Sequence, residues 1–338
     1  MVSAQVRVER PFPGLRPFEE AENYLFFGRE RQVDELLARL GRSHFLAVLG
    51  ASGSGKSSLV RAGLLPPLHK GYLTGGGSHW RAGLMRPGES PIRNLAETLA
   101  LSELPAQQEE SERETSVSPQ VPSHEEDLGM ARLAPQENLL VVVDQFEELF
   151  RFREKRENRD EAIAFVQLLL QAAQPARIYV LLTMRSDFLG DCSQFRGLPE
   201  AINESQYLVP RLTREQLRDA ITKPVALGGM TIAPRLVNRL LNEITDNQDQ
   251  LPVFQHALMR TWDDWREKGA AGSGLDLGHY DAIGGMAGAL SQHANEIYDG
   301  LTERGQLITE KLFKCSTEKG ADNRGIRRPT ALGEVSAV

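Results

Sequence analysis

The stretch FLAVLGASGSGKSS, residues 45–58, decides the fold, because a short apolar run leads into a glycine-rich loop and then into a helix-forming segment. The loop fits the pattern G-x-x-x-x-G-K-[ST], in which backbone N–H groups and the start of a helix converge on phosphate groups. Only glycine adopts the tight turns of such a loop without strain. The predicted phosphate-binding residues are Gly50, Ala51, Ser52, Gly53, Ser54, Gly55, Lys56, Ser57 and Ser58.

Two side chains of this loop have distinct predicted roles. Lys56 would place a mobile positive charge against the β- and γ-phosphates, and the Ser57 hydroxyl would coordinate Mg²⁺. A chance turn rich in glycine and serine is the alternative interpretation. The apolar run before the loop and the helix-forming run after it favour nucleotide binding. The sequence therefore predicts a P-loop nucleotide site that uses Mg²⁺.

A second stretch, LLVVVDQFEELF at residues 139–150, predicts the metal side of the site. Asp144 follows five apolar residues, as expected of the strand-end carboxylate that holds Mg²⁺, although it could also cap the next helix. Gln145 stands where many ATP hydrolases have a glutamate, and the glutamates follow as Glu147 and Glu148. Either could be the general base, but the D-x-x-E spacing of Glu147 fits a helix-capping box equally well.

Arg185 is the third candidate catalytic residue. It follows the apolar run at residues 178–182, so we expect it at the sheet edge where strand ends gather around a ligand. A guanidinium group there can detect whether the γ-phosphate is present. The alternative is a surface ion pair with Asp187 or Asp191.

The pattern of apolar runs predicts an α/β fold. Amphipathic helical patterns separate runs that are apolar throughout, which is typical of parallel strands buried on both faces. These runs lie at residues 45–49, 80–85, 139–143, 178–182 and 207–209. We therefore expect a parallel sheet flanked by helices. After residue 210 the strand patterns stop and helical patterns follow, the first opened by Thr213 and Gln216 at capping-box spacing.

Composition suggests where the domains begin and end. Residues 102–138 are rich in Glu, Ser, Gln and Pro, so we expect a mobile acidic insertion, with a regulatory loop as the alternative. The glycine-rich segment EKGAAGSGLDLG predicts a flexible linker. The predicted units are an N-terminal extension (1–27), a P-loop domain (28–210), a helical lid subdomain (211–268), a linker (269–278) and a C-terminal region (279–338).

Bulk properties exclude several classes of protein. The formal net charge of −7 gives no overall electrostatic reason to bind nucleic acid, so we expect no nucleic-acid partner. The two cysteines, Cys192 and Cys315, cannot form a disulfide framework. No apolar run approaches the ~18 residues that a membrane helix needs. The sequence therefore predicts a soluble cytoplasmic protein without a membrane partner.

Taken in order, several stretches resemble the bacterial novel STAND NTPases, which are signal-transduction ATPases related to AAA+ and apoptotic ATPases. The segments that carry the resemblance are PFPGLRPFEEAENYLFFGRERQVDELLARL, LAVLGASGSGKSSLVRAGLLP, LMRPGESP, LLVVVDQFEELF, LLTMRSDFLGDC and QYLVPRLTREQLRDAI. The resemblance extends from about residue 11 to about residue 329. Such an ordered combination is far more specific than the P-loop alone.

The resemblance implies further site residues and a C-terminal fold. Backbone around Phe27 and Gly28 would contact adenine, where an ordinary loop is the alternative. Pro252 would touch the adenine side and relay the nucleotide state, although by spacing alone it is a helix-start proline. The segment from Tyr280 would form an incomplete winged-helix region.

The resemblance also implies an activity. We expect an ATP-binding switch that is closed with ADP, opens and self-associates with ATP, and resets by slow hydrolysis. Sensor or effector domains would belong to a longer chain or to separate proteins. The alternatives are a conventional oligomeric AAA+ loader or remodeller and a scaffold that binds ATP without hydrolysing it. A GTPase is disfavoured because no N-K-x-D motif occurs.

Overall fold

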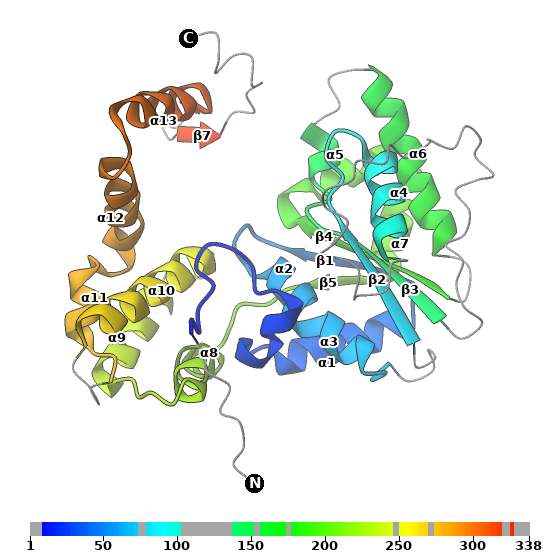
Figure 1. Cartoon of the computed structure of the whole chain (residues 1–338). Coiled ribbons are helices and arrows are strands. Elements are labelled where there is room, and N and C mark those ends of the chain that lie inside the picture. Colours follow the sequence, from blue (N-terminus) through cyan, green and yellow to red (C-terminus); the bar gives the residue numbers. More distant parts are fainter. Residues whose placement is uncertain are drawn as a thin grey trace.

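A five-stranded parallel sheet forms the centre of the α/β domain in the computed structural model (Figure 1). The structure describes residues 9–73, 79–102, 137–151, 156–173, 177–245, 250–269, 274–319 and 325–327. The strand order is β2-β3-β4-β1-β5, and every neighbouring pair is parallel. The strands are β1 (Phe45–Gly50), β2 (His79–Met85), β3 (Glu137–Val143), β4 (Ile178–Arg185) and β5 (Gln206–Leu208). The predicted fold class is confirmed.

Helices cover both faces of this sheet, which explains why β1, β3 and β4 are buried along nearly their whole length. One face carries α4 (Pro91–Ser102), α6 (Arg156–Ala172) and α7 (Leu198–Glu204). The other carries α1 (Glu30–Leu40) and the helical segment after the P-loop, which comprises α2 (Lys56–Ser58), η2 (Leu59–Leu64) and α3 (Leu65–His69). Alternate side chains of β1 enter the two layers, so all six of its residues are buried.

A helical subdomain follows the sheet. It contains α8 (Arg214–Leu227), α9 (Pro234–Thr245), α10 (Leu251–Lys268) and α11 (Leu277–Ala282). The predicted capping box opens α8, because Thr213 Oγ1 accepts from Gln216 N at 3.2 Å and Gln216 Oε1 accepts from Thr213 N at 2.9 Å. The core of the subdomain includes Leu240, Phe254 and Trp262, all nearly inaccessible to solvent.

The predicted linker at residues 269–278 is wrong in its second half. Residues 270–273 lie outside the described part of the chain, but Leu275 is fully buried and pairs with Thr231 and Ala233 through backbone hydrogen bonds of 2.8 Å. Tyr280, expected in the C-terminal region, packs in the core of the helical subdomain. The glycines suggested flexibility, but the burial of Leu275 and Tyr280 extends the subdomain beyond residue 268.

The described part of the C-terminal region contains two helices and a pair of short strands. These elements are α12 (Gly285–Asp299), α13 (Glu303–Cys315) and the antiparallel strands β6 (Thr317–Lys319) and β7 (Gly325–Arg327). Figure 1 shows α12 and α13 leading away from the helical subdomain. The winged-helix assignment stays a prediction. Most of the predicted acidic insertion, residues 103–136, lies outside the described residues. Within the described chain, no helix has the length and apolarity needed to cross a membrane.

The N-terminal extension, predicted only as an extension, crosses between the two domains as a strap. This N-terminal strap, residues 9–25, runs from the helical subdomain to the helix after the P-loop (Figure 1). At one end Phe12 is buried in the core of the helical subdomain, and Trp262 Nε1 donates to Glu9 O at 3.0 Å. At the other end Phe18 N donates to Ser58 Oγ at 3.2 Å. Its last six residues form the short helix η1 (Glu20–Leu25), which packs on η2.

Replacing Phe12 by alanine should therefore weaken the helical subdomain. The side chain is 1% exposed, and truncation of a buried phenylalanine costs about 3–5 kcal/mol through lost burial and the cavity left behind. Chemical denaturation followed by tryptophan fluorescence measures the loss, because Trp262 lies in the same core. Leu15→Ala is the matched control, since Leu15 belongs to the same strap but is 52% exposed. Equal stability of the two variants would contradict the packing of the strap.

Candidate nucleotide-binding site

The P-loop forms the turn that its glycines predict. Gly53 and Gly55 have φ angles of 76° and 89°, in the left-handed region that favours glycine, and the helix begins at Lys56. Lys56 Nζ donates to Gly50 O at 2.9 Å and to Ala51 O at 2.8 Å, so the loop curls around its own lysine. Burial lowers the pKa of Lys56, while nearby Glu147 and Asp144 oppose this shift.

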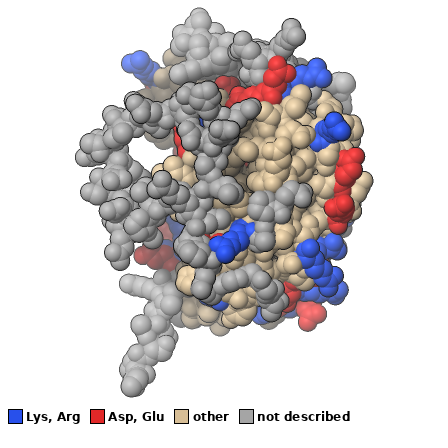
Figure 2. Space-filling view, turned by 90° about the vertical axis from the view of Figure 1, so that its right-hand side faces the viewer, with Lys and Arg blue, Asp and Glu red and all other residues tan. Residues whose placement is uncertain are grey.

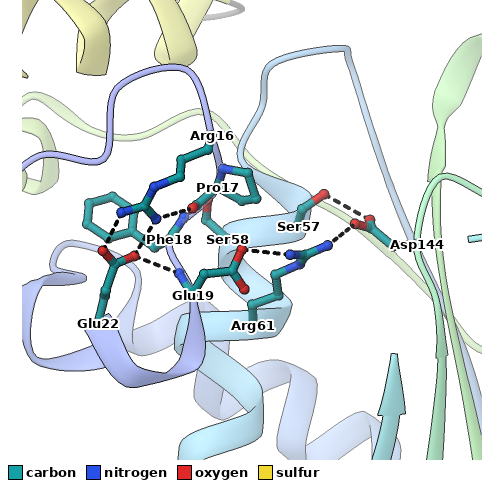
Figure 3. Close-up of polar contacts among 9 residues, drawn as sticks. All are labelled: Arg16, Pro17, Phe18, Glu19, Glu22, Ser57, Ser58, Arg61 and Asp144. Atoms are coloured by element: carbon teal, nitrogen blue, oxygen red, sulfur yellow. Dashed lines mark hydrogen bonds and ion pairs between the residues drawn. The ribbon is translucent and has the colours of Figure 1, made fainter. Parts of the chain in front are cut away.

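The structure brings Ser57 and Asp144, the predicted metal pair, together. The Ser57 hydroxyl donates to Asp144 Oδ1 at 2.8 Å, and the Asp144 side chain is only 1% exposed (Figure 3). Thr183 Oγ1 donates to the same oxygen at 2.6 Å, and Arg61 Nη2 donates to Asp144 Oδ2 at 3.2 Å. Thr183 and Arg61 were missed from sequence. Thr183 could have been found from sheet register, since Val143 pairs with Leu182.

The donors at this position fit a magnesium ion. A hydroxyl and a carboxylate are oxygen ligands, which Mg²⁺ prefers, and Mg²⁺ usually keeps water and phosphate oxygens as its other ligands. Among the described residues no group of three or more His, Cys, Asp and Glu side chains could hold a metal alone. A metal at Ser57 and Asp144 would therefore depend on a bound phosphate.

The two candidate glutamates face different parts of the chain. Glu147 is 8% exposed and lines the cavity beside the P-loop, and its Oε2 accepts the backbone N–H of Arg185 at 3.3 Å. Glu148 begins α5 (Glu148–Arg151), and its Oε2 accepts from Gly88 N at 3.2 Å. The bond of Glu147 thus goes to a neighbouring strand rather than to the start of the next helix. This geometry favours Glu147 over Glu148 as the residue that meets a phosphate-bound water.

Arg185 forms one of the ion pairs offered as its alternative interpretation, and its role in detecting a phosphate stays a prediction. It forms the ion pair with Asp187, which lowers the pKa of that carboxyl group, and its guanidinium carbon lies 5.5 Å from the centre of the Phe188 ring. It also lines the cavity. Its Nε is buried and has no hydrogen-bond partner among the described residues. A phosphate oxygen would satisfy that donor.

The cavity has a volume of about 280 Å³ and lies between three parts of the chain. The α/β domain contributes the P-loop and the strand ends that carry Gln145, Thr183 and Arg185. The N-terminal strap contributes residues 13–18, which sequence reasoning missed. The helical subdomain and the turn that leads into it contribute an apolar wall formed by Leu212, Leu217, Ala220, Leu251, Pro252 and Phe254.

The three residues expected near adenine differ in their placement. Phe27 and Pro252 line the cavity. Gly28 does not belong to its lining, and its glycine requirement has another cause. Its φ is 87°, and a Cβ atom there would lie 2.5 Å from Gln216 O, so the close approach is to α8 rather than to a base.

Arg29 is a further residue that the sequence did not single out. It is 5% exposed, and its guanidinium group donates to Pro210 O at 2.7 Å and to Ser54 O at 3.1 Å. Burial lowers its pKa to about 10. Arg29 therefore fixes the P-loop to the connection between β5 and α8, where the two domains meet.

Fold and site together define a P-loop NTPase. A parallel sheet ends in a phosphate-binding loop, and the strand two places away carries the carboxylate that meets the loop serine. The family described as Novel STAND NTPase 1 matches residues 11–338. The chain therefore belongs to this family, and the predicted resemblance is confirmed. A comparison with curated proteins found no match.

Solved structures of two proteins from Aeropyrum pernix share this fold. ORC2 of Aeropyrum pernix, solved in complexes with ADPNP and ADP, has a TM-score of 0.52 and 13% identity over 84% of this chain and 73% of that protein. ORC1 of Aeropyrum pernix, solved in complex with DNA, has a TM-score of 0.50 and 14% identity over 92% of this chain and 76% of that protein. At these identities the likeness shows the fold alone.

Charged side chains of both signs occur on the face of the α/β domain shown in Figure 2. Acidic and basic groups alternate around an area of uncharged residues, so the described part of this face has no large region of a single sign. The comparisons do not support the prediction that nucleic acid is no partner, since one similar protein was solved with DNA. That expectation stays a prediction.

Glu147→Gln should lower hydrolysis of the bound nucleotide far more than Glu148→Gln. A glutamine cannot accept the proton of the attacking water, and removal of a general base costs about 10²- to 10⁴-fold in rate. Single-turnover hydrolysis at saturating nucleotide measures the effect without interference from binding. Glu148→Gln serves as the control one residue away and should retain most of the rate. A greater loss with Glu148→Gln would assign the base to Glu148.

Proposed function

We propose that this protein is an ATP-binding switch that hydrolyses its nucleotide slowly with Mg²⁺ and acts as the regulatory NTPase module of a signalling system. It holds ADP in a closed form, and exchange for ATP opens it and allows self-association. Sensor and effector functions belong to other segments or proteins. The observation that carries the proposal is the cavity walled by the P-loop, the N-terminal strap and the helical subdomain.

Such a cavity suits a switch because one ligand touches three parts that could otherwise move separately. The apolar wall from Leu212 to Phe254 suits a base, and the P-loop end suits phosphates. A ligand shifts a conformational equilibrium only by its difference in affinity for the two forms. The γ-phosphate distinguishes ATP from ADP, and it would meet Lys56, Glu147 and Arg185 at the strand ends. Diphosphate and triphosphate can therefore favour different arrangements.

The residues of the site support a mechanism for hydrolysis. Lys56 binds the phosphates, and Ser57 with Asp144 would hold Mg²⁺, which neutralises phosphate charge when it is bound. Water attacks the γ-phosphorus, Glu147 accepts its proton, and the bond to the β-phosphate breaks to leave ADP and phosphate. Arg185 is paired with Asp187, so its guanidinium group must give up that pair to reach the γ-phosphate fully. This competition is consistent with slow turnover.

The purified protein should carry tightly bound ADP, and Lys56→Ala should remove it. Loss of the lysine charge should weaken ADP binding by about 100-fold or more, in line with a buried charge-assisted contact. Chromatography of the nucleotide released on denaturation identifies the ligand, and titration with a fluorescent ADP analogue measures the affinity. Lys70→Ala is the control, because Lys70 lies exposed at the end of the same helical segment.

Mass measurement tests the switch itself. The proposal expects a monomer with ADP and a larger species with a non-hydrolysable ATP analogue.

Retained micromolar ADP affinity in Lys56→Ala would overturn the P-loop assignment. Rapid turnover with freely exchanging nucleotide would favour the conventional oligomeric ATPase. Tight ATP binding without measurable hydrolysis would favour a scaffold.

A further inference from the structure

Arg61 connects the metal-side carboxylate to the N-terminal strap. It lies in η2, four residues after Ser57, so the two side chains share one face of the helical segment. Its Nη2 donates to Asp144 Oδ2 at 3.2 Å, and its Nη1 donates to Glu19 Oε1 at 2.7 Å (Figure 3). The Arg61 side chain is 15% exposed. One guanidinium group is therefore shared between two carboxylates from different parts of the chain.

The strap holds Glu19 in place for this contact. Arg16 forms two hydrogen bonds with the Glu22 carboxylate, at 2.7 and 2.6 Å. Glu22 Oε2 in turn accepts the backbone N–H of Glu19 at 2.9 Å (Figure 3). Arg16 also lines the nucleotide cavity. The position of Glu19 thus depends on a segment that a bound nucleotide would touch.

Asp144 needs a cation in its neighbourhood. A carboxylate that is 1% exposed is costly unless hydrogen bonds and an opposite charge compensate it. The hydroxyls of Ser57 and Thr183 donate hydrogen bonds to Asp144 Oδ1, and Arg61 donates one to Asp144 Oδ2. A divalent cation held by Ser57 and Asp144 would repel the Arg61 guanidinium and compete with it for the same carboxylate.

We propose that Arg61 is a positioning residue that sets how strongly the site binds its metal and links metal binding to docking of the strap. The inference rests on the proposed function, because it assumes a metal–nucleotide ligand. When the cation binds, Arg61 loosens from Asp144 and binds Glu19 more fully, which tightens the strap over the cavity. Because coupling between two binding events is reciprocal, a docked strap also favours the cation.

Substitution of Glu19 and substitution of Arg61 should change the Mg²⁺ concentration needed for half-saturation in opposite directions. Glu19→Gln removes the charge that draws Arg61 away, so Arg61 should bind Asp144 alone and more Mg²⁺ should be needed. Arg61→Gln removes the competing cation, so less Mg²⁺ should be needed. Each half-saturation concentration should shift on the order of fivefold, as expected for one partly exposed charge contact. A purely structural role for Arg61 would weaken binding in both variants.

The experiment titrates Mg²⁺ into the full chain in the presence of a fluorescent ADP analogue, after removal of metal with a chelator. Glu20→Gln is the matched control for Glu19, because the adjacent Glu20 pairs with His69 instead. Arg93→Gln is the control for Arg61, because Arg93 forms an exposed pair with Glu97 on α4. Neither control substitution should change the Mg²⁺ concentration at half-saturation.

Limited chymotrypsin cleavage after Leu15, which is 52% exposed in the strap, reports the strap without any measurement of activity. In the wild type, addition of Mg²⁺ to the ADP-loaded protein should slow this cleavage several-fold. In Arg61→Gln the addition of Mg²⁺ should leave the cleavage rate unchanged. If Arg61→Gln does not fold, the shift of Glu19→Gln against Glu20→Gln decides the question by itself.

The double variant Glu19→Gln with Arg61→Gln gives a further check. Its Mg²⁺ midpoint should equal that of Arg61→Gln, because Glu19 acts only through Arg61. Shifts of the same sign in the two single variants, or an unchanged midpoint in Glu19→Gln, would overturn the role of Arg61 while nucleotide binding stands. A wild-type protein that binds no nucleotide at any Mg²⁺ concentration would overturn the proposed function, and this inference with it.

Discussion

The buried charge of Asp144 is the constraint on which the site depends. A carboxylate removed from water costs several kcal/mol unless it is compensated, and here three side chains from two separate parts of the chain compensate it. Ser57 and Arg61 come from the helical segment after β1, and Thr183 comes from β4, which lies between β1 and β3. The strand order therefore places β3 close enough for the P-loop helix to reach its end. This arrangement brings the glycine-rich loop and the buried carboxylate of Asp144 together at one edge of the sheet.

The turn after Asp144 decides which glutamate faces the cavity. Gln145 has a φ of 59°, which is uncommon for a residue with a side chain. Its N–H donates to Thr183 Oγ1 at 3.1 Å, while Phe146 is fully buried and Glu147 faces the cavity. The D-x-x-E spacing alone does not distinguish Glu147 from Glu148 as the general base. It does not reveal the positive φ of Gln145, which sets the direction of the chain after Asp144. The position where many ATP hydrolases have a glutamate thus serves here to direct the turn.

Local patterns were sufficient for the sheet, the P-loop and the cap at Thr213, because each depends on residues close in sequence. They were insufficient where a residue acts on a distant part of the chain. In the sequence, Phe12 is simply one residue of a proline-rich N-terminal segment. Its burial in the core of the helical subdomain is apparent only from the structure. The need for glycine at position 28 comes from Gln216, and the burial of Leu275 comes from the segment at Thr231 and Ala233. Contacts of this long range leave no signal in periodicity or composition.

Within the residues that the structure describes, the chain passes between the α/β domain and the helical subdomain twice. One passage is the N-terminal strap, anchored by Phe12 and Phe18, and the other is the connection that Arg29 binds at Pro210. Phe18 lies six positions after Phe12, which limits their span to roughly 20 Å in a fully extended chain. Two fixed crossings leave a rigid body free to rotate mainly about the line that joins them. Any opening of the cavity is therefore a rotation about one axis, unless an aromatic anchor leaves its core.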